Sequence, residues 1–249
     1  SGKHVSLYGD LVGLEGLASP GRTELLPYVA GRLRRAPGDP ANPFWRANDT
    51  WQGMGLDVKH GLTSNFTLTA TVNPDFGQVE ADPSLVNLTA FETFYEEKRP
   101  FFTEGTEIIG FRLMPEGYAF YSRRIGRPPQ LPVDVPDGGF ADLPEATPIL
   151  GAAKVSGKTA DGWSLGLMEA VTGQVDVDVS GPDGRGARPV EPMTNYAAAR
   201  VRRDFGGGWN ALGLFATAVN RRHNETAFAA LRSDSYFGAF DWRLRFGPD

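Results

Sequence analysis

Apolar and polar side chains alternate strictly over residues 65–73. The apolar positions are Phe66, Leu68, Ala70 and Val72, and asparagine or threonine stands between them. Because successive side chains of a strand point to opposite faces, this pattern predicts a strand with one apolar face. The preceding segment alternates in the same way, and a short polar connection separates the two. Segments 52–62 and 65–75 are therefore predicted to form a β-hairpin.

Six further segments show alternation or an apolar run of strand length. They are 22–34, 149–157, 162–172, 193–204, 208–219 and 236–246. Glycine-containing turns separate two pairs of these segments, at 157–162 and at 204–208. They predict a second and a third hairpin.

The connections between the eight predicted strands alternate between long and short. In chain order they are 35–50, 62–65, about 80–148, 157–162, 173–192, 204–208 and 220–233. Transmembrane β-barrels have this arrangement because their turns are short on one side of the membrane and their loops are long on the other. We therefore predict an all-β fold, an antiparallel up-and-down β-barrel of the outer-membrane type. A soluble sandwich or propeller with chance alternation is the alternative.

The predicted barrel implies positions for individual aromatic and charged side chains. Six aromatic residues near strand ends are candidates for an interfacial girdle: Trp51, Trp163, Tyr196, Trp209, Tyr236 and Trp242. Five charged residues are expected to face the lumen: Asp57, Lys59, Asp241, Arg243 and Arg245. Eight strands alone enclose almost no channel. We therefore expect residues 1–249 to form a single β-barrel domain that is a fragment of a larger barrel, with insertion 80–148 as a plug or surface loop.

Composition and net charge exclude several classes of function and of site. The chain has 249 residues, 31 glycines and 19 prolines, which suits many strands and turns. A net charge of −5 gives no electrostatic attraction to nucleic acid, so no nucleic-acid partner is predicted. The absence of cysteine excludes disulfides and thiolate sites. No run of about 18 apolar residues is present, so no transmembrane helix is predicted.

The most unusual segment is the charged, proline-containing insertion. It begins near Asp75, and a short amphipathic helix is predicted over Leu85–Glu97. The main interpretation is an ion-pair network that fixes the loop, with Glu97, Arg99, Arg123 and Arg124 as its anchoring residues. The alternative is a ligand or ion site, Ca²⁺ included, at Asp75, Glu80 and Asp82.

Catalytic motifs are absent from the sequence. The three histidines, His4, His60 and His223, belong to no recognisable triad or metal motif, and no nucleophile elbow or phosphate-binding loop is present. No catalytic residue, metal or other cofactor is therefore predicted. One enzymatic alternative stays open, a glycoside hydrolase that uses Glu80 and Asp82 as paired carboxylates.

Several long motifs resemble a known family. They are residues 55–62, 69–83, 97–105 and 120–127, and the likeness continues through 162–166 and 191–196. This combination resembles the C-terminal barrel-like domain of unknown function of bacterial envelope proteins that carry an N-terminal family-9-like carbohydrate-binding domain. The resemblance implies a non-enzymatic β-barrel in the bacterial outer membrane, with membrane lipid as a partner. It also implies a carbohydrate ligand and a role in uptake, binding or assembly. A soluble carbohydrate-binding β domain is the alternative.

Overall fold

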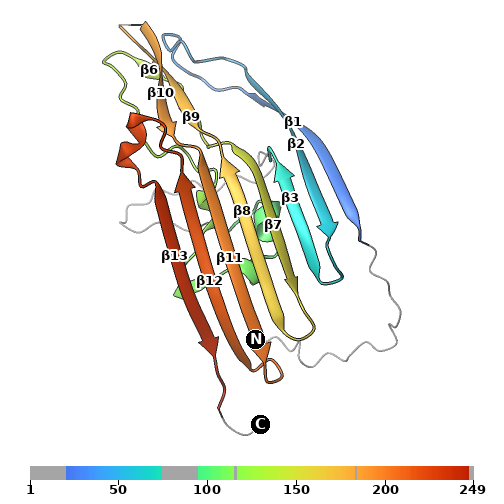
Figure 1. Ribbon diagram of the computed structural model, residues 1–249. Helices are drawn as coiled ribbons and strands as arrows, with labels where there is room; N and C mark the ends of the chain where they lie inside the picture. Colours follow the sequence, from blue (N-terminus) through green and yellow to red (C-terminus); the bar gives the residue numbers. More distant parts are fainter. Residues whose placement is uncertain (1–20, 75–94, 115–116, 183, 247–249) are drawn as a thin grey trace.

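One eight-stranded antiparallel sheet dominates the computed structural model, which describes residues 21–74, 95–114, 117–182 and 184–246 (Figure 1). Its strands, in spatial order, are β1 (Thr23–Arg34), β2 (Asp49–Gly61), β3 (Phe66–Val72), β7 (Ile149–Lys158), β8 (Trp163–Thr172), β11 (Thr194–Phe205), β12 (Asn210–Arg221) and β13 (Asp234–Arg243). All eight predicted strands and all three predicted hairpins are present. The all-β class is therefore confirmed.

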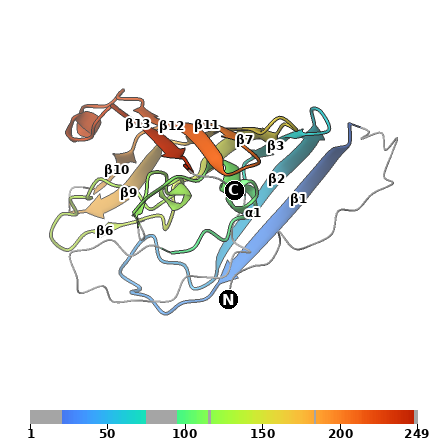
Figure 2. The same ribbon diagram turned by 90° about the horizontal axis from the view of Figure 1, so that it is seen from below.

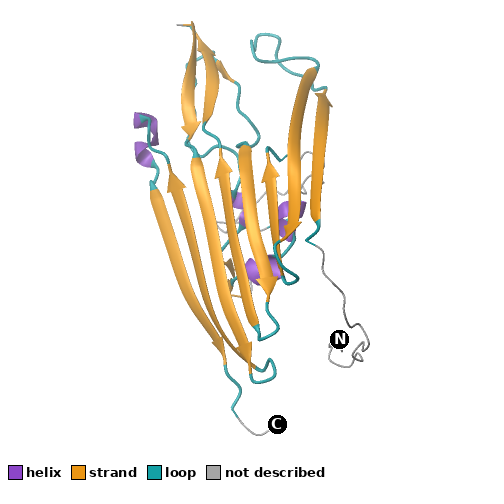
Figure 3. Ribbon diagram, turned by 45° about the vertical axis from the view of Figure 1, so that its right-hand side comes forward, coloured by secondary structure: helices purple, strands orange, loops and turns teal. Residues whose placement is uncertain are grey.

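The strands follow one another in chain order, so long and short connections leave from opposite ends of the sheet (Figure 3). The short turn between β11 and β12 shows why glycine is needed there. Gly206, Gly207 and Gly208 all have positive φ, at 60°, 65° and 87°, a conformation that other residues adopt at a cost.

Residues 173–192, predicted as a long connection, contain two strands that the sequence pattern was not used to predict. They contain β9 (Val175–Gly181) and β10 (Gly184–Glu191), which pair as a hairpin beyond the end of the main sheet. β6 (Phe140–Ala141) adds a third strand beside β9. Valines alternating with aspartates over 175–179 are the sequence signal for β9.

The eight strands do not close into a barrel among the described residues, which corrects the prediction on this point. Closure requires hydrogen bonds between the first and last strands, but β1 pairs with β2 and β13 pairs with β12. The result is an open sheet that curves like an arch (Figure 2). Residues 95–114 and 117–124 lie on its concave side.

The two faces of the sheet differ in chemistry. On the face away from the insertion, which we call the outer face, cross-strand neighbours are apolar over several strands, for example Val201, Leu214 and Phe240 on β11, β12 and β13. Many of these side chains are exposed: Leu25, Val29, Met54, Val72, Leu167, Leu212, Leu214, Phe240 and Trp242. The opposite, inner face carries charged and hydroxyl side chains, and the insertion covers part of it.

The main core lies between the insertion and the inner face. The insertion contains α1 (Pro100–Thr103), α2 (Thr106–Ile109), β4 (Arg112–Met114), β5 (Gly117–Tyr118) and the 3₁₀ turn η2 (Ser122–Arg124). Phe101, Phe102 and Ile109 pack against Met168 of β8. A Cβ atom on Gly166 would lie 2.6 Å from the Ile109 side chain, so glycine here allows α2 to approach the sheet.

The other predictions have mixed outcomes. Trp163, Tyr236 and Trp242 lie on the outer face, whereas Tyr196 is buried on the inner face and is not a girdle residue. Most of the helix predicted at 85–97 lies outside the described residues, and its last residues, 95–97, are not helical. A second 3₁₀ turn, η3 (Thr226–Ala230), occupies the long connection before β13. No helix in the described part of the chain is long and apolar enough to cross a membrane.

Candidate functional site

The predicted site residues fall into two groups. Asp75, Glu80 and Asp82, the candidate ligand or Ca²⁺ site, lie outside the described residues, and so does the glycosidase pair that two of them would form. Glu97, Arg99, Arg123 and Arg124 are described: Glu97 and Arg99 directly precede α1, and Arg123 and Arg124 lie in η2.

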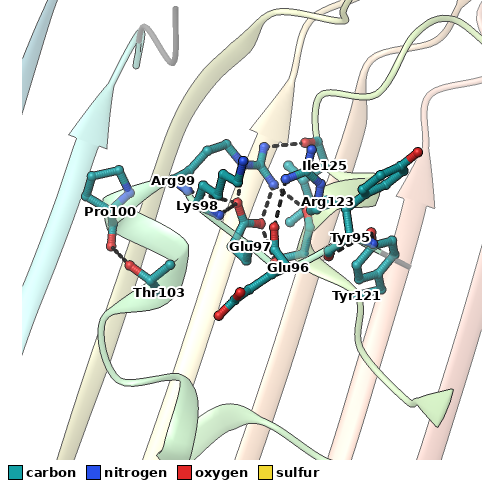
Figure 4. A network of polar contacts seen from close by, with 11 residues as sticks. Tyr95, Glu96, Glu97, Lys98, Arg99, Pro100, Thr103, Tyr121, Arg123 and Ile125 are labelled. Atoms are coloured by element: carbon teal, nitrogen blue, oxygen red, sulfur yellow. Dashed lines mark hydrogen bonds and ion pairs between the residues drawn. The ribbon is translucent and has the colours of Figure 1, made fainter. Parts of the chain in front are cut away.

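Glu97 and Arg99 form a two-pronged ion pair (Figure 4). Arg99 Nε donates to Glu97 Oε1 at 2.8 Å, and Arg99 Nη2 donates to Glu97 Oε2 at 2.7 Å. Each side chain is only 12% exposed. The remaining guanidinium donors reach the carbonyl oxygens of Ile125 and Ser122, at 2.7 and 2.8 Å. The Glu97 carboxylate neutralises the buried Arg99 charge, and the hydrogen bonds from Arg99 link its segment to the backbone at Ser122 and Ile125.

The carboxylate of Glu97 is also saturated with donors. Its Oε1 accepts the backbone N–H groups of Lys98 and Arg99, and its Oε2 accepts the hydroxyl of Ser122. Burial alone would raise the pKa of Glu97, but the hydrogen bonds and positive charge of Arg99, together with Ser122, outweigh it and lower this pKa below 4.5. Glu97 is therefore held as the anion.

Arg123 anchors the start of the same segment. It donates from Nη1 to the carbonyl oxygen of Glu96 at 2.9 Å, and its guanidinium lies 5.7 Å from the ring of Tyr95. The hydroxyl of Tyr121 accepts the N–H of Tyr95 and donates to its carbonyl oxygen. Together these contacts join residues 95–99 to residues 121–125, two segments that are separated by α1 and α2.

Lys154 joins the insertion to the main sheet. It lies on the inner face of β7, is 3% exposed, and its Nζ donates to the carbonyl oxygens of Phe101 and Glu104. The Phe101 ring lies 4.9 Å from the ammonium group. Lys59 of β2 forms an ion pair with the Glu104 carboxylate. Two lysines from different strands therefore hold the end of α1. Lys154 is not among the predicted site residues, although a lysine between alanine and valine in a strand was the available signal.

A cavity of about 430 Å³ lies between this part of the insertion and the sheet. Its walls are mostly aromatic and aliphatic, from Phe101, Phe102, Ile109, Phe111, Phe120 and Met168. Its polar lining includes Glu104, Glu107 and Lys154. An apolar hollow with a few polar groups is the usual form of a small-molecule site.

Charged pairs also cover the inner face beyond the cavity. Arg200 of β11 donates from Nη2 to both carboxylate oxygens of Asp241 on β13, at 3.0 and 3.1 Å. Its guanidinium lies 4.9 Å from the ring of Phe111, which stacks on Phe215 at 5.1 Å. Asp57, Lys59, Asp241 and Arg243 are all on this face, as their strand registers show. Arg245 follows the end of β13.

The histidines and carboxylates do not assemble a metal site in the described ranges. No group of three potential ligands occurs there. His60 Nδ1 lies 2.7 Å from the hydroxyl of Thr23, and His223 lies in the exposed loop after β12.

Comparison with known proteins assigns the chain to a family. The pattern of a family described as a domain of unknown function, DUF5916, matches residues 19–231. The chain belongs to this family. The predicted resemblance to an uncharacterised domain is confirmed to this extent, while its association with a sugar-binding module and with the outer membrane stays a prediction. No curated protein and no solved structure matches this DUF5916 chain.

Proposed function

We propose that this DUF5916 domain forms part of the wall of a non-enzymatic β-barrel in the bacterial outer membrane, with its insertion on the lumen side. The observation that carries the proposal is the difference between the faces of the sheet. The outer face presents Val29, Met54 and Leu214 with exposed fractions of 81%, 73% and 62%. Soluble monomers rarely expose an apolar surface that runs over so many strands. Contact with lipid would remove the free-energy cost of exposing this apolar surface to water.

Strand lengths support the same proposal. A transmembrane strand needs about 9–11 residues. Seven of the eight strands of the main sheet have between 10 and 13 residues each, namely β1, β2, β7, β8, β11, β12 and β13, whereas β3 has seven. The sorting of short turns to one end and long connections to the other is also typical of such barrels.

Aromatic and polar side chains at the ends of the outer face fit the boundaries of a bilayer. At the short-turn end, Trp163 on the outer face lies 5.2 Å from the guanidinium of Arg203, and Trp209 in the turn between β11 and β12 lies 4.2 Å from that of Arg245. At the long-loop end, Asn220 donates to the hydroxyl of Tyr236 at 2.9 Å. Trp and Tyr favour the interface because each ring has an apolar body and a polar group.

The open sheet has the form expected of one part of a larger barrel. An arch of eight strands that already holds an insertion on its concave side needs further strands to close around it. In this proposal, the Lys59–Glu104 and Arg200–Asp241 ion pairs lie in a polar lumen, where opposite charges and water solvate them.

The role in the envelope that we propose is carbohydrate-related uptake, binding or assembly, and the resemblance of the sequence motifs supports it. The glycoside hydrolase alternative depends on Glu80 and Asp82. No described residue adds support to that alternative.

Membrane extraction of the full-length protein tests the proposal. We expect the protein to stay in the membrane fraction after an alkaline carbonate wash, and to need detergent for purification as a monodisperse species. A stable monomer in aqueous buffer without detergent would contradict the proposal.

A further inference from the structure

The cavity beside α1 and α2 contains two polar groups with bonding capacity to spare. Lys154 has three N–H donors, and two of them go to the carbonyl oxygens of Phe101 and Glu104. Glu107 of α2 lines the same cavity; its carboxylate forms no hydrogen bond or ion pair among the described residues, and its charge attracts the Lys154 ammonium group. The third charged group, Glu104, already binds Lys59. One ammonium hydrogen and one carboxylate are therefore available to a ligand.

The rest of the lining determines what kind of ligand fits between them. Phe101, Phe102 and Phe111 form apolar walls, with Ile109 and Met168 beside them. Besides the charged groups, the described lining offers the hydroxyls of Tyr118 and Ser122, and Ser122 already donates to Glu97, so a sugar would leave several of its hydroxyl groups against these rings without partners. A simple anion would meet the carboxylates of Glu104 and Glu107, and a simple cation would meet the ammonium group of Lys154. A molecule that carries both charges and an apolar body avoids all three penalties.

We propose that this cavity binds a free amino acid with an aromatic or aliphatic side chain. The ligand carboxylate accepts the third N–H of Lys154, the ligand ammonium group pairs with Glu107, and the side chain packs among the phenylalanine rings. A volume of about 430 Å³ lies within the range of small-molecule sites. The site uses the insertion and the inner face only. It does not depend on whether the outer face contacts lipid.

Titration calorimetry on the full-length protein with L-phenylalanine tests the proposal. Three further probes separate the determinants: phenethylamine, which lacks the carboxylate, 3-phenylpropanoate, which lacks the ammonium group, and glucose. We expect saturable binding of L-phenylalanine and binding at least about tenfold weaker for each of the other three, since a charge-assisted hydrogen bond is lost or never formed.

Glu107→Gln is the decisive variant because the Glu107 carboxylate forms no hydrogen bond or ion pair among the described residues and acts on the insertion only through its charge near Lys154, so we expect the isosteric substitution to preserve the packing of the insertion. We expect it to weaken L-phenylalanine binding by about tenfold or more. Glu225→Gln is the matched control, since Glu225 is an exposed carboxylate in the loop after β12 and its side chain has no cap hydrogen bond. The proposal is overturned if L-phenylalanine does not bind, if a single-charge probe or glucose binds as tightly, or if Glu107→Gln binds like the wild type.

Discussion

Arg99 binds both carboxylate oxygens of Glu97, only two residues earlier in the chain, in a pair of which each side chain is 12% exposed. The same guanidinium lies 4.2 Å from the ring of Phe102. One arginine therefore closes the segment before α1 and holds an aromatic ring of the core. This arrangement explains why charged residues stand directly before the Pro100-Phe101-Phe102 run.

Removing one partner of this pair should destabilise the insertion. Glu97→Gln leaves the Arg99 charge without a carboxylate in a nearly dry environment, and we expect a loss of about 3 kcal/mol in the free energy of unfolding of this region. Hydrogen exchange measures the effect at residues 95–125. Arg34→Gln is the control, because its pair with Glu145 is exposed and contributes little. Equal protection in the wild type and Glu97→Gln would contradict this role.

The lowered pKa of Glu97 predicts how stability depends on pH. A carboxyl group whose pKa is lower in the folded state stabilises that state above its unfolded pKa, near 4.5, and this contribution disappears as the pH falls through the folded pKa. Protection of residues 95–125 should therefore fall below about pH 4.5. Glu97→Gln should show a weaker dependence in the same range, whereas an unchanged slope would show that other groups control it.

Lys154 and Lys158 offer a comparison on one strand. Lys154→Met removes the donor to the Phe101 and Glu104 carbonyls, and we expect a cost of about 2 kcal/mol from the unsatisfied oxygens. Limited proteolysis should then cut residues 100–147 faster. Lys158→Met removes only an exposed pair with Asp204 and should leave the rate unchanged. Similar rates for both variants would mean that Lys154 does not hold the insertion.

Arginine substitutions at Leu214 and Leu143 test whether the outer face contacts lipid or water. Their exposed fractions are nearly equal, at 62% and 61%, but only Leu214 lies on the outer face of the sheet. If that face contacts lipid, Leu214→Arg should lower the free energy of unfolding in vesicles by about 2–4 kcal/mol. Leu143→Arg should change it by less than about 0.5 kcal/mol, as for an ordinary surface position. Equal small effects would place both residues in water.

Most strands could be predicted because one face is apolar and the other polar, whereas 193–204 and 208–219, which are apolar on both sides, could be predicted from the glycine turn that joins them. The alternation in 65–73 and the glycine turn at 204–208 indicate strands and their pairing within a hairpin, since short turns join adjacent strands. Closure could not be predicted in the same way. It depends on hydrogen bonds between strands at opposite ends of the sheet, and no local pattern encodes those.

The site was harder to predict because its residues come from distant segments. Glu97 and Arg99 are close in sequence, so a pairing between charges in that run was a natural hypothesis. Lys154 and Glu107 meet at one cavity only because α2 packs on β8 over Gly166. The charge pattern within the insertion could not predict that Lys154 of β7 contacts it from the sheet.

Spin labels along β12 test the central claim most directly, and the absence of native cysteine makes single labelling sites simple to introduce. Labels at Leu214, Ala216 and Ala218 lie on the outer face, and labels at Thr217 and Val219 lie on the inner face. In the full-length protein reconstituted in vesicles, we expect high oxygen and low nickel-chelate accessibility at the three outer positions only, with a period of two. High nickel-chelate accessibility at the outer positions would contradict a lipid-facing wall.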